Sequence, residues 1–289
     1  MRIANIQGRA HLVTEAGGCD IEVASAGHFS GEPQVLLGVI DDLARWAASA
    51  TPKLDPQLST EELAAHPDWL GPPVPDPSQV FAIGLNYQSH TDETGLTRPE
   101  APMVFTKFPS SLAGPGDDIR IRTPTVDWEV ELVVVIGRGG RDIPAASSLD
   151  HVAGYCIGQD LSDRTLQFQG SPPQFSLAKS AAGYAPIGPW LTTVDELGEP
   201  DAIAKGLAIG CSIDGEAVQD GNTRDLIFGV PALIEYLSRT CALRPGDLIF
   251  TGTPSGVGYS RKPPRFLQPG TVLGSRIEGL GALCNPLVE

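Results

Sequence analysis

The chain has 289 residues, of which 41% are hydrophobic, and a formal net charge of −15. So acidic a surface argues against binding to nucleic acid or to an anionic membrane, and no stretch approaches the ~20 apolar residues of a membrane span. The first residues lack the basic-then-apolar pattern of a secretory signal. We therefore expect a cytoplasmic protein with one large domain, or with a large domain and a small one.

The first part of the chain predicts a small α/β unit. Strands are expected near residues 2–6 and 10–14, and the amphipathic run QVLLGVIDDLARWAA predicts a helix near 34–48. Residues 51–78 are polar and rich in proline, which is typical of a connection. These features predict a small N-terminal domain over residues 1–70.

The remainder, residues 71–289, predicts a strand-rich domain. The 33 glycines, 26 prolines and few aromatic residues of the chain suit many short strands joined by turns. Helices are expected near 87–95, just after Asp163, and over 230–239. The expected strands are 80–84, 103–107, 119–122, 129–136, 152–159 and 207–213, the last entering a hairpin at Asp214-Gly215. The chain as a whole predicts an α+β fold rich in strands.

The segment DWEVELVVVIG, residues 127–137, combines acidic and apolar character. Residues 132–136 are all apolar and four of them are β-branched, which predicts a strand buried on both faces. Glu129 and Glu131 are two residues apart and therefore lie on one side of this strand. Because burial of an unpaired carboxylate is costly, we expect a lysine, an arginine or a metal ion between them.

Asp160 ends another strand-like run, HVAGYCIGQD, and could supply a third carboxylate. Three carboxylates without a nearby histidine or cysteine suit a hard ion such as Mg²⁺, Mn²⁺ or Ca²⁺ better than zinc. The alternative is an ion pair of Glu129 with Arg120 or Arg122. Spacing alone leaves both possibilities open.

Three weaker signals accompany these carboxylates. His90 and Glu93 are three residues apart, so on a helix they would share a face and form a general-base pair, or simply be solvated. Lys179, an isolated lysine in FSLAKSAAG, is either paired with a buried carboxylate or exposed. In the glycine-rich segment TGTPSGVG, residues 251–258, Thr253 offers a hydroxyl and an N–H to an anion, unless the loop is only a tight connection.

Seven motifs follow one another along the chain: GLNYQSH, DWEVELVVVIG, GQDLSDRTLQ, LAKS, DGEAVQ, PGDLIFTGTPSGVG and IEGLGAL. In this order they resemble the fumarylacetoacetate hydrolase family, over about residues 78–285. The resemblance implies a mixed β-sheet roll, a bound Mg²⁺ or Mn²⁺ ion and a homodimer. The N-terminal ~70 residues resemble the small variable domain that precedes the core in many members.

The resemblance also implies roles for individual residues. The metal ligands are Glu129, Glu131 and Asp160; the catalytic residues are the dyad His90 and Glu93, on a mobile lid helix, and Lys179; the substrate-binding residues are Tyr87, Arg164, Gln167 and Thr253.

Three positions depart from the family pattern. Gln159 stands where many members have asparagine, and Ala181-Ala182 stand where many have Phe-Asp, which predicts a wider pocket. Leu85 stands where decarboxylases and acylpyruvases often have arginine, which weakens an assignment to their substrates.

The family's substrates are 2-oxo acids, often with a second carbonyl at C4. We expect hydrolysis of the C3–C4 bond of an acylpyruvate-like 2,4-dioxo acid to a carboxylate and pyruvate or another 2-oxo acid, because a complete His90–Glu93 dyad is most useful when water must be activated. The alternatives within the family are an oxaloacetate-type decarboxylase and an isomerase or hydratase of a 2-oxo-dienoic acid. A Schiff-base aldolase using Lys179 and a non-catalytic binding protein are the competing classes. Arg261, Lys262 and Arg265 form a basic cluster that either meets a second substrate carboxylate or is solvated.

Overall fold

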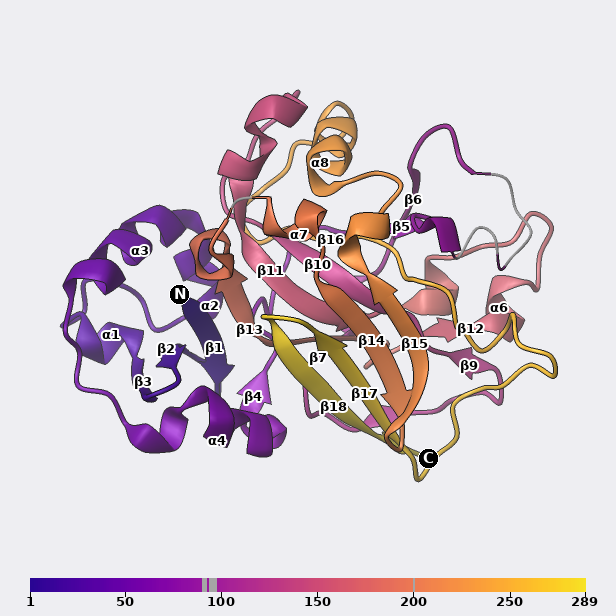
Figure 1. Cartoon of the computed structure of the whole chain (residues 1–289), viewed down its shortest axis with the longest axis horizontal. Helices are drawn as coiled ribbons and strands as arrows, with labels where there is room; N and C mark the ends of the chain where they lie inside the picture. The colour runs from indigo at the N-terminus through magenta and orange to yellow at the C-terminus, as the bar shows by residue number, and fades with distance from the viewer. Residues whose placement is uncertain (90–92, 94–97, 200) are drawn as a thin grey trace.

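Strands dominate the computed structural model, which describes residues 1–89, 93, 98–199 and 201–289 (Figure 1). They form an eleven-stranded sheet, a five-stranded sheet and a two-stranded ribbon. This arrangement confirms the predicted α+β, strand-rich fold. Among the helices within these ranges, none is both long enough and apolar enough to cross a bilayer.

The eleven-stranded sheet is the largest structural element of the molecule. In spatial order its main path is β3 (Gly17–Asp20), β2 (Arg9–Thr14), β1 (Arg2–Ile6), β13 (Ala185–Thr193), β11 (Val152–Gln159), β10 (Val130–Ile136), β16 (Leu248–Phe250), β5 (Val80–Gly84) and β6 (Met103–Thr106). In addition, β4 (Leu70–Gly71) pairs with β1, and β7 (Leu112–Ala113) pairs with β13. The antiparallel pair β10 and β11 is therefore interior to the sheet, with a neighbour on each side.

The five-stranded sheet packs on one face of the large sheet. Its order is β15 (Glu216–Asn222), β14 (Ala208–Ile213), β17 (Val272–Ile277), β18 (Gly281–Val288) and β8 (Ile119–Arg120). Buried Ile209 and Leu273 from this sheet share one hydrophobic core with Leu132 of β10. The ribbon consists of β9 (Val126–Asp127) and β12 (Ser162–Asp163). In the chain, β9 comes just before the start of β10, and β12 comes just after the end of β11.

All seven residues of β10 are buried, as the run of β-branched residues predicts. Leu132 and Val134 belong to the core shared with the five-stranded sheet, whereas Val133 and Val135 belong to a second core on the opposite face. The strand is thus packed on both sides, which limits its movement. Glu131 lies on the same side as Val133, since alternate residues of a strand face the same way.

The N-terminal strands continue the large sheet, because Arg2 and Ile3 of β1 pair with Thr192 and Leu191 of β13. Short helices lie around them: α1 (Ile21–Ala24), α2 (Pro33–Leu36), α3 (Ile40–Ser49) and α4 (Thr60–Ala65). The predicted helix 34–48 is wrong as one continuous element, since a 3-10 turn interrupts it and Val39 has the non-helical dihedral angles φ −129° and ψ 24°. A domain boundary near residue 70 remains a prediction.

All six strands predicted for the larger part are present. β5 and β11 have the predicted bounds, and β6, β8, β10 and β14 agree within two residues at each end. Helices α6 (Arg164–Gln167) and α8 (Val230–Ser238) also lie where expected, and α7 (Ala202–Lys205) is additional. The helix expected near 87–95 falls largely outside the described residues. β13 was not predicted, because Pro186, Gly188 and Pro189 read locally as a turn.

Gly154 allows β11 and β13 to approach closely, which leads to a stability prediction. A Cβ atom at this position would lie 2.2 Å from the carbonyl oxygen of Thr192. We expect Gly154→Ala to lower the free energy of unfolding by about 1–3 kcal/mol, since the backbone of an interior strand must shift. Chemical denaturation measures this loss. The matched control is Gly38→Ala, where a Cβ meets nothing within 4 Å; equal stability of the two variants would contradict the expectation.

Candidate active site

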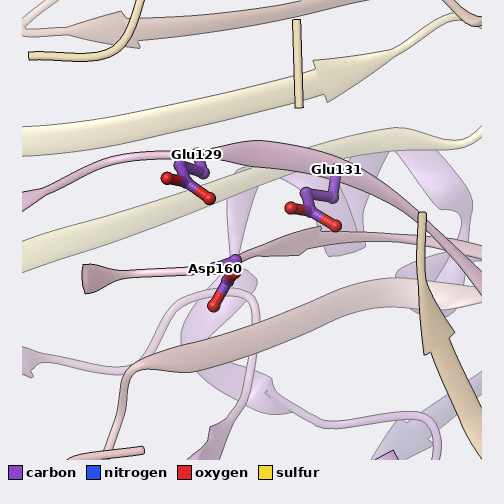
Figure 2. A group of neighbouring side chains, drawn as sticks. All are labelled: Glu129, Glu131 and Asp160. Carbon is purple, nitrogen blue, oxygen red and sulfur yellow. The ribbon is translucent and has the colours of Figure 1, made fainter. Parts of the chain in front are cut away.

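Three buried carboxylates meet where β10 begins and β11 ends. Glu129 directly precedes β10, Glu131 is its second residue, and Asp160 directly follows β11. The antiparallel register places Val130 opposite Gln159, so the two strand ends are adjacent. One oxygen of each carboxylate lies within 4.8 Å of the others (Figure 2). The spacing of Glu129 and Glu131 predicts that these two share a side, and the structure confirms that Asp160, the expected third carboxylate, lies beside them.

Two cationic side chains contact Glu129. The Lys179 ammonium donates to Glu129 Oε2 at 2.8 Å and to Asp160 Oδ2 at 2.6 Å. The Arg164 guanidinium donates to Glu129 Oε1 at 2.6 Å. The expected arginine partner therefore exists, but it is Arg164 rather than the exposed Arg120 or Arg122.

Lys107 is a third buried cation and was missed in the sequence. Its Nζ donates to Asp160 Oδ1 at 2.7 Å, and the residue is 1% exposed. Burial lowers the pKa of Lys107 in spite of this ion pair, whereas the carboxylates of Asp160 and Glu129 outweigh burial and raise the pKa of Lys179. The signal in the sequence was the same as for Lys179, a single lysine between apolar residues in FTKFP.

Glu131 differs from the other two carboxylates, because no lysine or arginine in the described ranges forms an ion pair with it. Its Oε2 accepts a hydrogen bond from the Gly252 N–H at 2.7 Å. Burial and the negative charges of Asp160 and Glu129 raise its pKa well above the ordinary value. A bound divalent cation would offset this excess negative charge, and an all-oxygen donor set suits Mg²⁺ or Mn²⁺. The residues present thus fit a metal of this class.

Asp127 and Gln159 hold the start of β10 in place. Neither residue was predicted to have a role in the site. Asp127 accepts from Arg164 Nε at 2.9 Å and from the N–H groups of Gly258 and Tyr259 at 2.7 and 3.0 Å. Gln159 Oε1 accepts from the Glu129 N–H at 2.9 Å. Both side chains act by positioning Glu129 and Arg164.

The glycine-rich loop after β16 lies over the same strand. The Thr253 hydroxyl donates to the Val130 carbonyl and accepts from Gln219 Nε2, both at 2.8 Å. The hydroxyl proton expected to be free for an anion is therefore used to attach the loop to β10. The Gly256 N–H donates to Glu93, at 3.0 Å to Oε1. The loop thus connects one residue of the predicted dyad to the carboxylate site.

The remaining predicted site residues lie as follows. Gln167 Oε1 accepts from Arg164 Nη1 at 2.8 Å, so it orients the guanidinium. Tyr87 is buried, and burial together with the negative charge of Glu131 raises its pKa, which places it electrostatically near the carboxylates. His90 lies outside the described residues. The catalytic and substrate-binding roles of these residues remain predictions, as does the homodimer.

Binding of Mn²⁺ to metal-free protein is expected to release protons. The reason is that burial and the negative charges of Asp160 and Glu129 raise the pKa of Glu131, so this carboxyl holds its proton to a higher pH than an ordinary glutamate and the cation competes with that proton. Titration calorimetry in buffers of different ionisation enthalpy measures the number of protons released. Affinity should also fall as the pH is lowered, and an Mn²⁺ affinity that does not change with pH would contradict this account.

Several known proteins are similar to this chain. The chain matches the family model for the C-terminal domain of fumarylacetoacetate (FAA) hydrolase over residues 79–288. The mitochondrial oxaloacetate tautomerase fahd2 of Xenopus laevis is 41% identical over 218 residues, which are 75% of this chain and 67% of that protein.

Two crystal structures are similar as well. A Mycobacterium smegmatis protein provisionally named HpcE is 50% identical, with a TM-score of 0.90 over 100% of this chain and 99% of that one. Fumarylpyruvate hydrolase from Pseudomonas aeruginosa, in complex with Mn²⁺ and pyruvate, is 33% identical, with a TM-score of 0.65 over 76% of this chain and 92% of that one. Because the family model matches residues 79–288, which are most of this chain, the chain belongs to the fumarylacetoacetate hydrolase family.

Proposed function

We propose that this protein is a divalent-metal-dependent enzyme that hydrolyses the C3–C4 bond of a 2,4-dioxo acid. The observation that carries the proposal is the buried triad of Glu129, Glu131 and Asp160, in which no lysine or arginine of the described ranges forms an ion pair with Glu131. The similar fumarylpyruvate hydrolase, crystallised with Mn²⁺ and pyruvate, supports this class of reaction.

Glu129, Glu131 and Asp160 would hold the Mg²⁺ or Mn²⁺ ion. The ion would act as a Lewis acid on the oxygen atoms of the bound 2-oxo acid. Lys179 and Arg164 bring two further positive charges to Glu129, and these reduce the repulsion between an anionic substrate and a protein of net charge −15.

His90 is the proposed general base, and Glu93 its orienting partner. His90 takes a proton from water, whose oxygen then forms a bond to C4. The C3–C4 bond breaks, its electron pair moves to give the enolate of pyruvate, and C4 leaves as a carboxylic acid. The proton taken up by His90 is then transferred to C3 of the enolate, which yields pyruvate and returns His90 to its neutral form. The link from Glu93 to the Gly256 N–H supports this arrangement, since it ties the orienting residue to the loop above β10.

His90→Ala is expected to lower the rate of hydrolysis by ~10²–10⁴-fold, the usual contribution of a general base. Mn²⁺ affinity should not change, because the three carboxylates remain. The measurements are kcat and calorimetric Mn²⁺ binding, with the exposed His28→Ala as control. A His90→Ala variant that hydrolyses at the normal rate would remove His90 from the mechanism.

Keto–enol tautomerisation of oxaloacetate is the second candidate. The 41% identity to a protein named oxaloacetate tautomerase favours it. Tautomerisation requires only a proton transfer at C3, without attack by water.

The deciding experiment incubates metal-stripped protein with acetylpyruvate or with oxaloacetate, with and without Mg²⁺ or Mn²⁺. Metal-dependent formation of acetate and pyruvate from acetylpyruvate supports hydrolysis. Metal-dependent loss of the enol absorbance of oxaloacetate without release of CO₂ supports the tautomerase, whereas CO₂ above the free-ion background indicates a decarboxylase. Turnover of acetylpyruvate that is insensitive to EDTA would contradict the metal-dependent proposal.

A further inference from the structure

Aromatic rings lie directly beside the two cations that contact Glu129. The Arg164 guanidinium carbon is 5.9 Å from the ring centroid of Tyr259, and Phe168 stacks on Tyr259 with centroids 5.0 Å apart. On the other cation, Lys179 Nζ is 5.2 Å from the ring centroid of Phe105. Each of the two cations that contact Glu129 thus also lies beside an aromatic ring.

The Phe168–Tyr259 pair is open to solvent, whereas the cation beneath it is not. Phe168 is 43% exposed and Tyr259 is 48% exposed, but Arg164 is only 7% exposed. Leu166, on the helix α6 that precedes Phe168, is 40% exposed. An apolar surface therefore begins where the buried charges of the site end. Such a boundary suits a ligand with a charged head and an apolar tail.

The basic cluster of the same loop does not supply a matching site for a second carboxylate. Arg261 Nη2 donates to the Val218 carbonyl at 2.7 Å and to the Gly256 carbonyl at 3.1 Å, and its guanidinium lies over the Trp128 ring. Arg265 forms an ion pair with Glu216 at 2.9 Å. Two of the three basic residues are therefore engaged within the protein.

We propose that Phe168 and Tyr259 bind the substrate tail, and that this tail is a flat apolar group such as a phenyl ring rather than a carboxylate. The inference rests on the proposed function, because it takes the 2-oxo acid head to lie at the carboxylate triad. An aryl tail buries apolar area against the two rings and gains aromatic contact. A carboxylate tail would instead lose hydration beside rings that offer it no hydrogen bond.

The test compares two acids that differ only in the group on C4, and neither can be hydrolysed at C3–C4. Binding of 2-oxo-4-phenylbutanoate and 2-oxoglutarate to Mn²⁺-loaded protein is measured by calorimetry, with pyruvate as the tail-less reference. We expect the phenyl acid to bind roughly tenfold more tightly than 2-oxoglutarate. Phe168→Ala and Tyr259→Ala should each weaken binding of the phenyl acid several-fold more than they weaken binding of pyruvate. Tyr259→Phe should retain the preference for the phenyl acid over 2-oxoglutarate.

Tyr236→Ala is the matched control, because Tyr236 is a 40% exposed aromatic residue on α8. It should leave the affinities for all three acids unchanged. If 2-oxoglutarate binds as tightly as the phenyl acid or more tightly, the inference is overturned while the proposed function stands. The same holds if the Phe168 and Tyr259 variants lose equal affinity for pyruvate and for the phenyl acid. If none of the three acids binds the Mn²⁺-loaded protein, the proposed function itself fails.

Discussion

Replacing Glu131 with glutamine is expected to abolish most metal-dependent activity and, at the same time, to stabilise the metal-free protein. Loss of one of three anionic ligands should lower kcat/KM by roughly 10²-fold or more, because Lewis-acid stabilisation is worth several kcal/mol. The glutamine oxygen can still accept the Gly252 N–H, so the local hydrogen bond is preserved.

The stability gain follows from the sign of the pKa shift. The pKa of Glu131 is higher in the folded protein than in the unfolded chain, so the folded state holds this proton more tightly. Stability is therefore lost as the pH rises from the ordinary glutamate value through the raised one. Glu131→Gln removes this loss, and thermal unfolding of metal-free protein should show a higher Tm at pH 7 than the parent.

The exposed Glu61→Gln is the control for this experiment, with neither effect expected. A Glu131→Gln variant that retains Mn²⁺ binding and activity would show that the glutamate is not a ligand. A lower Tm in the metal-free state would show instead that its charge is balanced by a cation in the fold.

The second large effect is expected for Lys179→Met. The ammonium joins Glu129 and Asp160, so its removal leaves two buried carboxylates with fewer positive partners. Removing one member of a buried ion-pair network typically costs about 3–5 kcal/mol, since the remaining charge is not compensated. We expect a loss of this order in the free energy of unfolding, measured by chemical denaturation of metal-free protein.

Added Mn²⁺ should recover part of that stability, because a cation at the triad compensates the same carboxylates. Lys53→Met, at an exposed lysine, is the control and should unfold like the parent. If Lys179→Met is as stable as the parent without metal, then the contacts of Lys179 do not balance the triad.

The sequence predicted those parts of the site whose signal is local. The β-branched run of β10 identifies a buried strand, and two glutamates at alternate positions before it must share one side. The residues missed, Lys107 and Asp127, obtain their role from partners far along the chain. Lys107 contacts Asp160, 53 residues away, and Asp127 contacts the N–H of Gly258, 131 residues away. A local pattern can indicate a buried lysine at Lys107, but it does not identify the distant partner of either residue.

The same distinction explains the fold. Strands with continuous apolar runs, such as β5 and β11, were found with their bounds. β13 was missed because its prolines and glycine are tolerated only next to the particular neighbours that the tertiary structure supplies, including the short β7 beside Pro186. The helix 34–48 was predicted as one element because its amphipathic period is continuous, although the chain turns at Gly38 and Val39.

The pairing of β1 with β13 has a consequence for the solubility of shortened chains. β13 joins β11 on one side, and on the other side β1 covers it at Leu191 and Thr192. A fragment confined to the family-matched residues 79–288 would lack β1 and expose the backbone donors and acceptors of this strand. Open strand edges of this kind pair readily with other chains. The first strand thus protects the sheet that carries Asp160 from aggregation, although it lies outside the carboxylate site.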